Sequence, residues 1–157
     1  MVSSIFSTYS QGENRVTSSI IQVLQNLPVN VVERFLEMFT QDDEGSVAHS
    51  SQEPFFRFKN QPKGERSVPD AEISAKFSVL IETKIKPNSV RKQQLEEHLR
   101  LAQRGSSLVY LTPDYSCPNI LKDKDVTWKN FQNVYDLIDE LIREPTLIMS
   151  ERDQFLL

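Results

Sequence analysis

The chain has 157 residues, of which 38% are hydrophobic and 25% are charged, and its formal net charge is −4. This is the size and composition of one ordinary globular domain, which excludes collagen-like, coiled-coil and wholly disordered chains. A single cysteine, Cys117, excludes an internal disulfide framework. The sequence has no apolar run of the roughly 18 residues that a membrane helix needs, and no secretory signal pattern. These features predict a cytoplasmic protein that does not enter a membrane.

The net charge hides an uneven distribution along the chain. Residues 1–50 carry 2 basic and 6 acidic side chains, and residues 130–157 carry the same numbers, so each segment has a net charge of −4. Residues 51–129 carry 14 basic and 10 acidic side chains, a net charge of +4. The local field matters more to a polyanion than the total charge does, so nucleic acid is not excluded as a partner. The alternative interpretation is a solvated helix face.

The first half of the chain changes from a helical to an alternating pattern. Apolar side chains at helical spacing predict helices over residues 12–27 and 29–39. Alternating apolar side chains then predict three strands, over residues 54–60, 68–74 and 76–84. Helices followed by adjacent strands predict helices packed on a sheet.

The second half adds a helix between strands. A polar helix is expected over residues 89–104, and a continuous apolar strand, of the kind that is buried on both faces, over residues 106–112. A short strand at 126–128 and an amphipathic helix at 129–143 complete the pattern. The order predicts an α/β fold, a three-layer sandwich in which a mixed sheet of about four to five strands is flanked by helices.

The domain organisation follows from the same pattern. Residues 1–145 are assigned to one domain, and the apolar stripe near its end, which includes Tyr135, is expected in the core. Ser150 is typical of a helix N-cap, so residues 146–157 are expected to start a further helix. Because that helix has no end in the sequence, we expect the chain to be cut from a longer protein. An additional C-terminal domain and a homodimer both remain open.

Acidic and basic side chains converge on two of the expected strands. Glu82 and Lys84 point to the same face of their strand, because side chains alternate. A hairpin around Ser74 and Ala75 places Asp70 on the adjacent strand. Neighbouring carboxylates repel each other unless a cation neutralises them, and Mg²⁺ or Mn²⁺ bound through oxygen satisfies that need. Such an ion activates water, and a nearby lysine balances the charge of a phosphoryl transition state.

These residues resemble a known nuclease pattern. Pro69-Asp70 and Glu82-Thr83-Lys84 are similar to the two halves of the PD-(D/E)xK phosphodiesterase superfamily motif, the restriction-endonuclease-like fold of many restriction and repair nucleases. Glu13 lies where members often carry a further glutamate on an N-terminal helix. Many members also place Gln-x-x-x-Tyr on the helix after the lysine, and here Gln94 is followed by His98 in place of the tyrosine. The role of His98 is therefore left open.

The resemblance implies a role for each matching position. Asp70, Glu82, Glu13 and the backbone carbonyl of Thr83 would bind the metal ion, Lys84 would orient or activate the attacking water, and Gln94 would support the site. Phosphate contacts are inferred from charge and not from the motif. They are assigned to four basic residues that follow the lysine: Lys86, Arg91, Lys92 and Arg100.

Each assignment has a structural alternative. Asp70 could be a solvated carboxylate at a strand end, and Glu82 and Lys84 an ion pair on an exposed strand. Glu13 suits the first turn of a helix through the helix dipole alone. Glu72 shares a face with Asp70 and is an alternative ligand.

The resemblance implies a Mg²⁺-dependent phosphodiesterase. An endonuclease is favoured over an exonuclease and DNA over RNA, and restriction or defence is the usual setting of the family. The alternative is a non-catalytic module on the same fold that binds nucleic acid or takes part in assembly. A third interpretation is a plain interaction domain in which the motif is accidental.

Overall fold

A computed structural model describes residues 12–41, 56–60, 69–75, 77–102 and 106–157, apart from the side chains of Glu13, Asn14 and Asn60. The helices are α1 (Gly12–Gln25), α2 (Val29–Thr40), α3 (Lys92–Ala102), α4 (Phe131–Arg143) and α5 (Glu151–Leu156). The strands are β1 (Arg57–Asn60), β2 (Ala71–Ser74), β3 (Ser78–Thr83), β4 (Ser106–Thr112) and β5 (Thr127–Asn130). No helix in the described ranges is long and apolar enough to cross a membrane.

The strands described here form one mixed sheet with the order β1-β2-β3-β4-β5. β1, β2 and β3 are antiparallel neighbours, whereas β3, β4 and β5 run parallel. β2 and β3 form the hairpin that the sequence predicts, and Ala75 N–H donates to the carbonyl of Phe77 in its turn. Parallel strands need a crossover, and α3 provides the one between β3 and β4.

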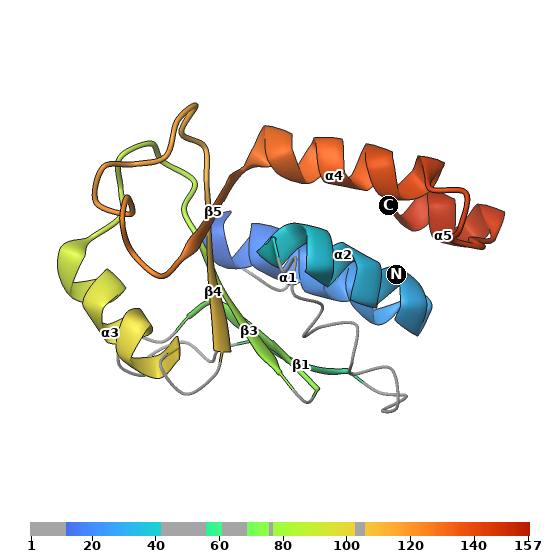
Figure 1. The fold of residues 1–157 in the computed structure, drawn as a ribbon, viewed down its shortest axis with the longest axis horizontal. Coiled ribbons are helices and arrows are strands. Elements are labelled where there is room, and N and C mark those ends of the chain that lie inside the picture. Colours follow the sequence, from blue (N-terminus) through green and yellow to red (C-terminus); the bar gives the residue numbers. More distant parts are fainter. Residues whose placement is uncertain (1–11, 42–55, 61–68, 76, 103–105) are drawn as a thin grey trace, which may run out of the picture.

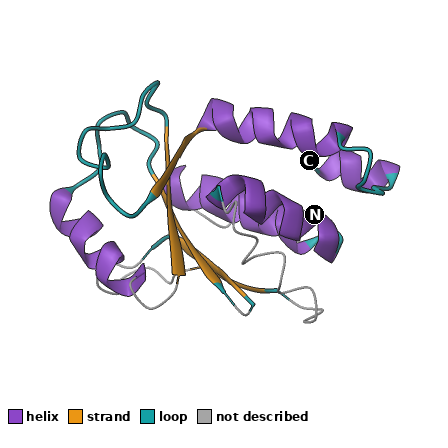
Figure 2. Cartoon of the chain, viewed as in Figure 1, coloured by secondary structure: helices purple, strands orange, loops and turns teal. Residues whose placement is uncertain are grey.

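Helices cover both faces of the sheet and produce three layers (Figure 1). α1, α2 and α4 lie on one side of the sheet, and α3 lies on the other. The colouring by secondary structure in Figure 2 shows the same separation, with the long loop between β4 and β5 beyond one end of the strands. The predicted α/β sandwich with a mixed sheet flanked by helices is therefore confirmed.

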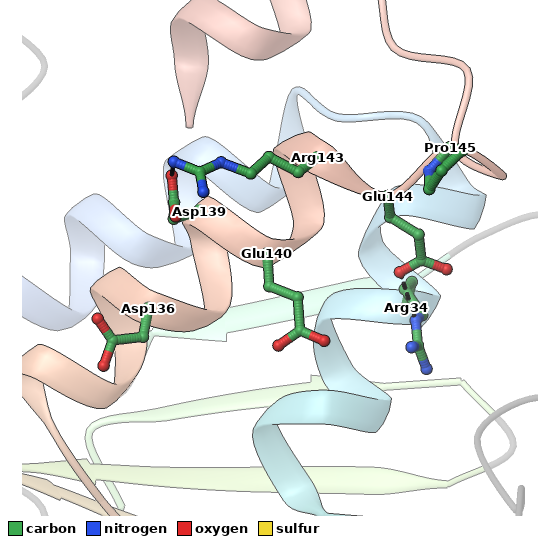
Figure 3. Close-up of a pocket in the computed structure, with 7 residues that line it drawn as sticks. All are labelled: Arg34, Asp136, Asp139, Glu140, Arg143, Glu144 and Pro145. Atoms are coloured by element: carbon green, nitrogen blue, oxygen red, sulfur yellow. Dashed lines mark hydrogen bonds and ion pairs between the residues drawn. The ribbon is translucent and has the colours of Figure 1, made fainter.

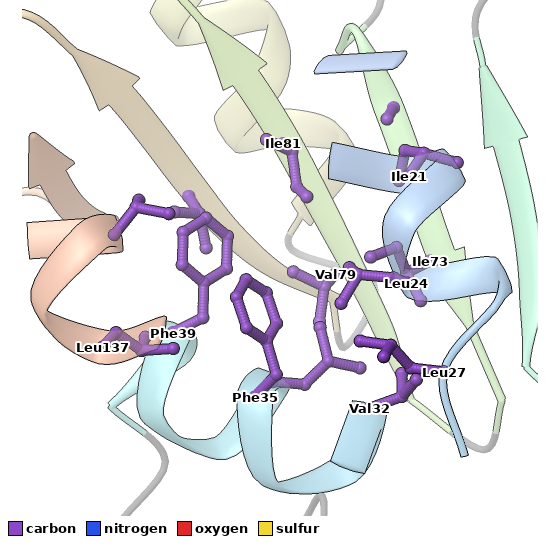
Figure 4. Packing of buried hydrophobic residues seen from close by; sticks show 14 of the residues in the cluster. Ile21, Leu24, Leu27, Val32, Phe35, Phe39, Ile73, Val79, Ile81 and Leu137 are labelled. Carbon is purple, nitrogen blue, oxygen red and sulfur yellow. The ribbon is translucent and has the colours of Figure 1, made fainter. Parts of the chain in front are cut away.

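The larger hydrophobic core lies between the sheet and the layer of α1, α2 and α4 (Figure 4). Phe35 and Phe39 of α2 stack with ring centroids 5.2 Å apart, and they pack beside Val79 of β3. Val79 and Ile81 face this layer, so the alternate residues of β3, Leu80 and Glu82, face α3. The second cluster lies on that side and contains Leu80, Leu95, Leu108, Tyr110 and Leu121.

The strand pattern thus decides which side of the sheet each polar residue joins. Even-numbered positions of β3 face α3, and the parallel pairing of Glu82 with Tyr110 brings Tyr110 to the same side. The layer beneath α3 is small, and polar groups enter it at the carboxyl ends of β3 and β4. This end of the sheet carries the predicted motif.

One expectation about the core is wrong. Tyr135 is 65% exposed, whereas its neighbours Val134 and Leu137 are buried. The buried side of α4 follows Val134, Leu137 and Leu141, at spacings of three and four residues. Tyr135 lies about 100° away from Val134 around the helix, so it points to solvent.

Candidate active site

Asp70 and Glu82 lie at neighbouring positions of the β2–β3 hairpin. The antiparallel ladder pairs Ala71 with Ile81, so one step further along it Asp70 comes opposite Glu82. Residues opposite each other share a face, with Cβ atoms about 4.5–5.5 Å apart in regular pairs. Asp70 also contacts β3 directly, since its Oδ2 accepts a hydrogen bond of 2.8 Å from the backbone N–H of Thr83. The hairpin therefore brings the acidic residues of the motif to one end of the sheet.

The carboxylate of Glu82 is buried and is held by two donors. Only 1% of the residue is exposed. Its Oε1 accepts one hydrogen bond of 2.6 Å from Lys84 Nζ and another of 2.6 Å from Gln94 Nε2. Lys84 is itself buried, and its backbone N–H donates to the carbonyl of Leu111. Such charge-assisted hydrogen bonds in a buried site fix the position of the carboxylate.

The direction of the Lys84 side chain follows from the alternation of side chains along β3. Glu82 and Lys84 are two positions apart, so both project to the α3 side of the sheet. Gln94 reaches the same carboxylate from the first turn of α3. An exposed strand with a surface ion pair, the structural alternative for Glu82 and Lys84, does not fit their burial.

Tyr110 lies in the electrostatic field of both carboxylates. Burial raises the pKa of the Tyr110 hydroxyl well above its ordinary value, and the negative charges of Glu82 and then Asp70 raise that pKa further. The hydroxyl therefore stays protonated at neutral pH. The register of the strands accounts for this, since Glu82 pairs with Tyr110 and Asp70 lies opposite Glu82 on the same face.

The opposite side of β3 anchors α1. The hydroxyl of Thr17 in α1 donates a buried hydrogen bond of 2.8 Å to the hydroxyl of Thr83. At the start of the helix, a Cβ on Gly12 would lie 2.7 Å from Cδ1 of Ile85, the residue after Lys84. The first turn of α1, which includes Glu13, therefore begins beside the end of β3. The Glu13 side chain lies outside the described part of the structure.

The four predicted phosphate-contacting residues are exposed: Lys86, Arg91, Lys92 and Arg100. Lys86 lies in the turn after β3, and Arg91 precedes α3. Lys92 Nζ lies 3.9 Å from Glu96 Oε1 in an exposed pair one helical turn long. An exposed pair of this kind binds weakly and leaves both side chains free to rearrange.

Glu72, the alternative ligand, lies two residues nearer to the β2–β3 turn than Asp70 does. It pairs with Leu80 and not with Glu82. Its Oε1 accepts a hydrogen bond of 3.5 Å from the Ser78 hydroxyl. Glu72 thus shares the face of Asp70, as expected, but it lies nearer to the turn and further from Lys84.

Two residues without an assigned role complete the surroundings of Glu82. His98 is fully buried in α3, and its Nδ1 shares a hydrogen bond of 3.0 Å with the Tyr110 hydroxyl. The same nitrogen lies 3.8 Å from Glu82 Oε2. The sequence contained one signal for this contact, the Gln94/His98 spacing of one helical turn. The sequence contained no signal for the position of Tyr110, because residue spacing does not determine how β3 pairs with β4.

The donor chemistry at this end of the sheet suits Mg²⁺ or Mn²⁺. Among the described residues no group of three or more His, Cys, Asp or Glu side chains could hold a metal ion. Mg²⁺ is commonly bound by one or two carboxylates and keeps several waters, so Asp70 and Glu82 fit it without such a cluster.

An acidic groove lies on the other helical layer (Figure 3). It has a volume of about 520 Å³ and is lined by Arg34, Asp136, Asp139, Glu140, Arg143, Glu144 and Pro145. Its arginines are engaged, since Arg34 Nε donates to Glu144 at 2.8 Å and Arg143 pairs with Asp139 at 3.0 Å. The acidic lining is unsuited to a polyanion. The lining residues belong to α2 and α4 or directly follow α4, and these helices cover the face of the sheet opposite α3.

Comparison with known proteins gives a structural likeness. No protein-family model and no curated protein matches the chain. Among solved structures, the chain is similar to the MspJI restriction endonuclease in complex with a 27-mer oligonucleotide, with 15% sequence identity and a TM-score of 0.38. The match covers 87% of this chain and 33% of that one, so the chain spans about a third of the length of that protein.

Proposed function

We propose that this chain is a metal-dependent nuclease domain that hydrolyses phosphodiester bonds of DNA. The observation that carries the proposal is the arrangement around Glu82: a buried carboxylate bound by Lys84 and Gln94, with Asp70 opposite it on the neighbouring strand. The observed order is two helices, three strands, a helix, two strands and two helices. It contains the series of helix, three strands, helix, strand and helix that the PD-(D/E)xK resemblance implies, with β5 as an additional strand before α4.

Asp70 and Glu82 are proposed to hold a Mg²⁺ or Mn²⁺ ion, together with the Thr83 backbone carbonyl and Glu13. When bound, the ion would supply Lewis acidity and lower the pKa of a coordinated water. The hydrogen bond from Thr83 N–H fixes one Asp70 oxygen, and those from Lys84 and Gln94 fix one Glu82 oxygen. A site fixed before the ion binds loses less freedom on binding.

Lys84 is proposed to orient the attacking water and to offset the charge that develops on the phosphoryl group. A buried ammonium stabilises negative charge more strongly than an exposed one, because little water screens it. Gln94 is a positioning residue, since it donates to Glu82 from α3.

The exposed cations beside the site are proposed to contact phosphates. Lys86, Arg91 and Lys92 lie on the turn and helix start that follow Lys84, and Arg100 lies in the last turn of α3. Phosphate contacts position a duplex without reading its sequence, so these residues would give affinity and orientation only. The proposal also includes a restriction or defence role and cleavage within a strand. It includes as well a homodimer or an additional domain.

The test is metal-dependent nicking of supercoiled plasmid. The wild-type chain is expected to nick plasmid with Mg²⁺ or Mn²⁺ and to stop when the metal is chelated. Asp70→Ala and Lys84→Ala are expected to lose at least 100-fold in rate, in the range set by removal of a group that stabilises transition-state charge. Glu72→Ala is the matched control, because it removes a carboxylate from the same face two residues along β2.

The outcomes separate the enzyme from its rivals. Cleavage that persists in folded Asp70→Ala and Lys84→Ala would show that another site or a contaminant is responsible. DNA binding without metal-dependent cleavage in the wild type would favour the non-catalytic module. Loss of cleavage in Glu72→Ala, with Asp70→Ala active, would move the ligand role to Glu72.

A further inference from the structure

Two polar side chains, those of His98 and Tyr110, lie near Glu82 among residues that are otherwise mostly apolar. His98 and Tyr110 are each fully buried on the α3 side of the sheet. Their neighbours in that cluster include Leu80, Leu95 and Leu108. Burying an imidazole and a phenol costs free energy unless their polar atoms are bonded, whereas Leu and Phe would fill the same space without that cost. The polar pair therefore calls for a reason other than packing.

The geometry supplies that reason. Tyr110 is the direct partner of Glu82 in the parallel ladder of β3 and β4. Its hydroxyl bonds to Nδ1 of His98 at 3.0 Å, and that nitrogen lies 3.8 Å from Glu82 Oε2. The other oxygen of Glu82, Oε1, is the one that Lys84 and Gln94 bind. The two oxygens of one carboxylate thus face two different sets of polar groups.

A carboxylate that is bonded at one oxygen can still rotate about its last side-chain bond. Contacts at the second oxygen fix the plane of the group as well as its position. His98 Nδ1 lies 3.8 Å from Oε2, beyond hydrogen-bond length, so it borders that oxygen as a packed polar neighbour, and Tyr110 fixes the imidazole by its hydrogen bond. Groups that contact a metal ligand fix its orientation without touching the metal. Their removal commonly weakens metal affinity about 10–100-fold.

We propose that His98 and Tyr110 form a positioning pair that sets the orientation of the Glu82 carboxylate and thereby the affinity of this site for a divalent cation. The inference rests on the proposed function, because it takes Glu82 as a metal ligand. It also assigns a role to the residue at which the chain departs from the Gln-x-x-x-Tyr pattern. Here the phenol is that of Tyr110 on β4, and its hydroxyl shares a hydrogen bond with His98 on α3.

The test is calorimetric titration of the full chain with MnCl₂. Tyr110→Phe removes only the hydroxyl and keeps the ring, and His98→Leu removes both ring nitrogens. Each is expected to weaken Mn²⁺ binding about tenfold or more. His98→Asn is the rescue variant, because its amide nitrogen lies near the position of Nδ1, and we expect its dissociation constant within about threefold of the wild type on the same scale.

The matched control is Tyr135→Phe, which makes the same change on the exposed side of α4 and is expected to leave Mn²⁺ binding unchanged. Thermal unfolding without metal shows whether each variant folds. A purely structural role would lower the melting temperature and leave the Mn²⁺ dissociation constant of the folded protein unchanged. If His98→Leu does not fold, Tyr110→Phe and His98→Asn decide the question.

The results distinguish failure of the pair from failure of the site. If the wild type binds Mn²⁺ and Tyr110→Phe binds it within twofold, the positioning pair is refuted and the metal site stands. If the wild type and Asp70→Ala both fail to take up Mn²⁺, the proposed function is refuted, and the pair with it. Weakened binding in Tyr110→Phe, restored affinity in His98→Asn and no effect of Tyr135→Phe would establish the pair.

Discussion

Lys84→Met tests the buried ion pair by its effect on stability. Methionine is unbranched and of similar length, so the change removes the ammonium with little change in packing. The Lys84 and Glu82 charges are 2.6 Å apart, which corresponds to an attraction of about 6 kcal/mol at an effective dielectric constant of about 20. The cost of burying the ammonium offsets part of this attraction.

Removal of one partner from a buried pair typically costs about 3–5 kcal/mol. For a domain of this size, the loss corresponds to a fall in melting temperature of roughly 10 °C or slightly more. The assay is urea denaturation at neutral pH without metal, followed by circular dichroism, with calorimetric melting as a second measure.

Lys92→Met is the matched control, because Lys92 pairs with Glu96 on the surface of α3. There the two side chains are 81% and 51% exposed and 3.9 Å apart. The control is expected to cost no more than about 0.5 kcal/mol. If Lys84→Met costs as little as Lys92→Met, the buried pair does not hold Glu82 in the way described.

Three further predictions concern other parts of the molecule. Asn130 accepts from the backbone N–H of Asn133 as the N-cap of α4, so Asn130→Ala is expected to cost about 1 kcal/mol in urea denaturation. The hydrogen bond from Arg34 lowers the pKa of Glu144 from 4.5, so this pair adds stability above that pH and loses it as the pH falls further. Arg34→Met should therefore flatten the acid side of the stability profile, and an unchanged profile would contradict the assignment. Replacing Arg91 and Lys92 by Gln should reduce the slope of log DNA affinity against log salt by about 2 without changing the cleavage pattern.

The sequence predicted the elements of the fold well where the hydrophobic period was unambiguous. The apolar run at 106–112 is β4 with the same bounds, and the alternation in 76–84 contains β3. The helix expected from residue 89 begins instead at Lys92, after a turn in which Asn88 adopts a left-handed φ of 53°. A change in the hydrophobic period identifies a helix or a strand clearly. A turn beside that helix or strand shifts its first or last residue.

Strand pairing explains what spacing alone could not predict. The motif placed Asp70, Glu82 and Lys84 on adjacent strands, since a short hairpin fixes the register of its own strands. β4 reaches β3 only after α3, so nothing local determines that Tyr110 is the neighbour of Glu82. The contact between Thr17 and Thr83, 66 residues apart, is equally non-local. The convergence of Asp70, Glu82, Lys84 and Gln94 was therefore predictable from the sequence, and the contacts made by Tyr110 and Thr17 were not.

Diffraction from crystals soaked in MnCl₂ shows whether Asp70 and Glu82 bind a divalent cation, because the anomalous signal of manganese locates the ion without assumptions about activity. We expect one strong anomalous peak between Asp70 and Glu82, at about 2.0–2.1 Å from a carboxylate oxygen of each, as is usual for a small divalent cation. A peak elsewhere on the molecule, with none between these carboxylates at saturating manganese, would contradict this expectation.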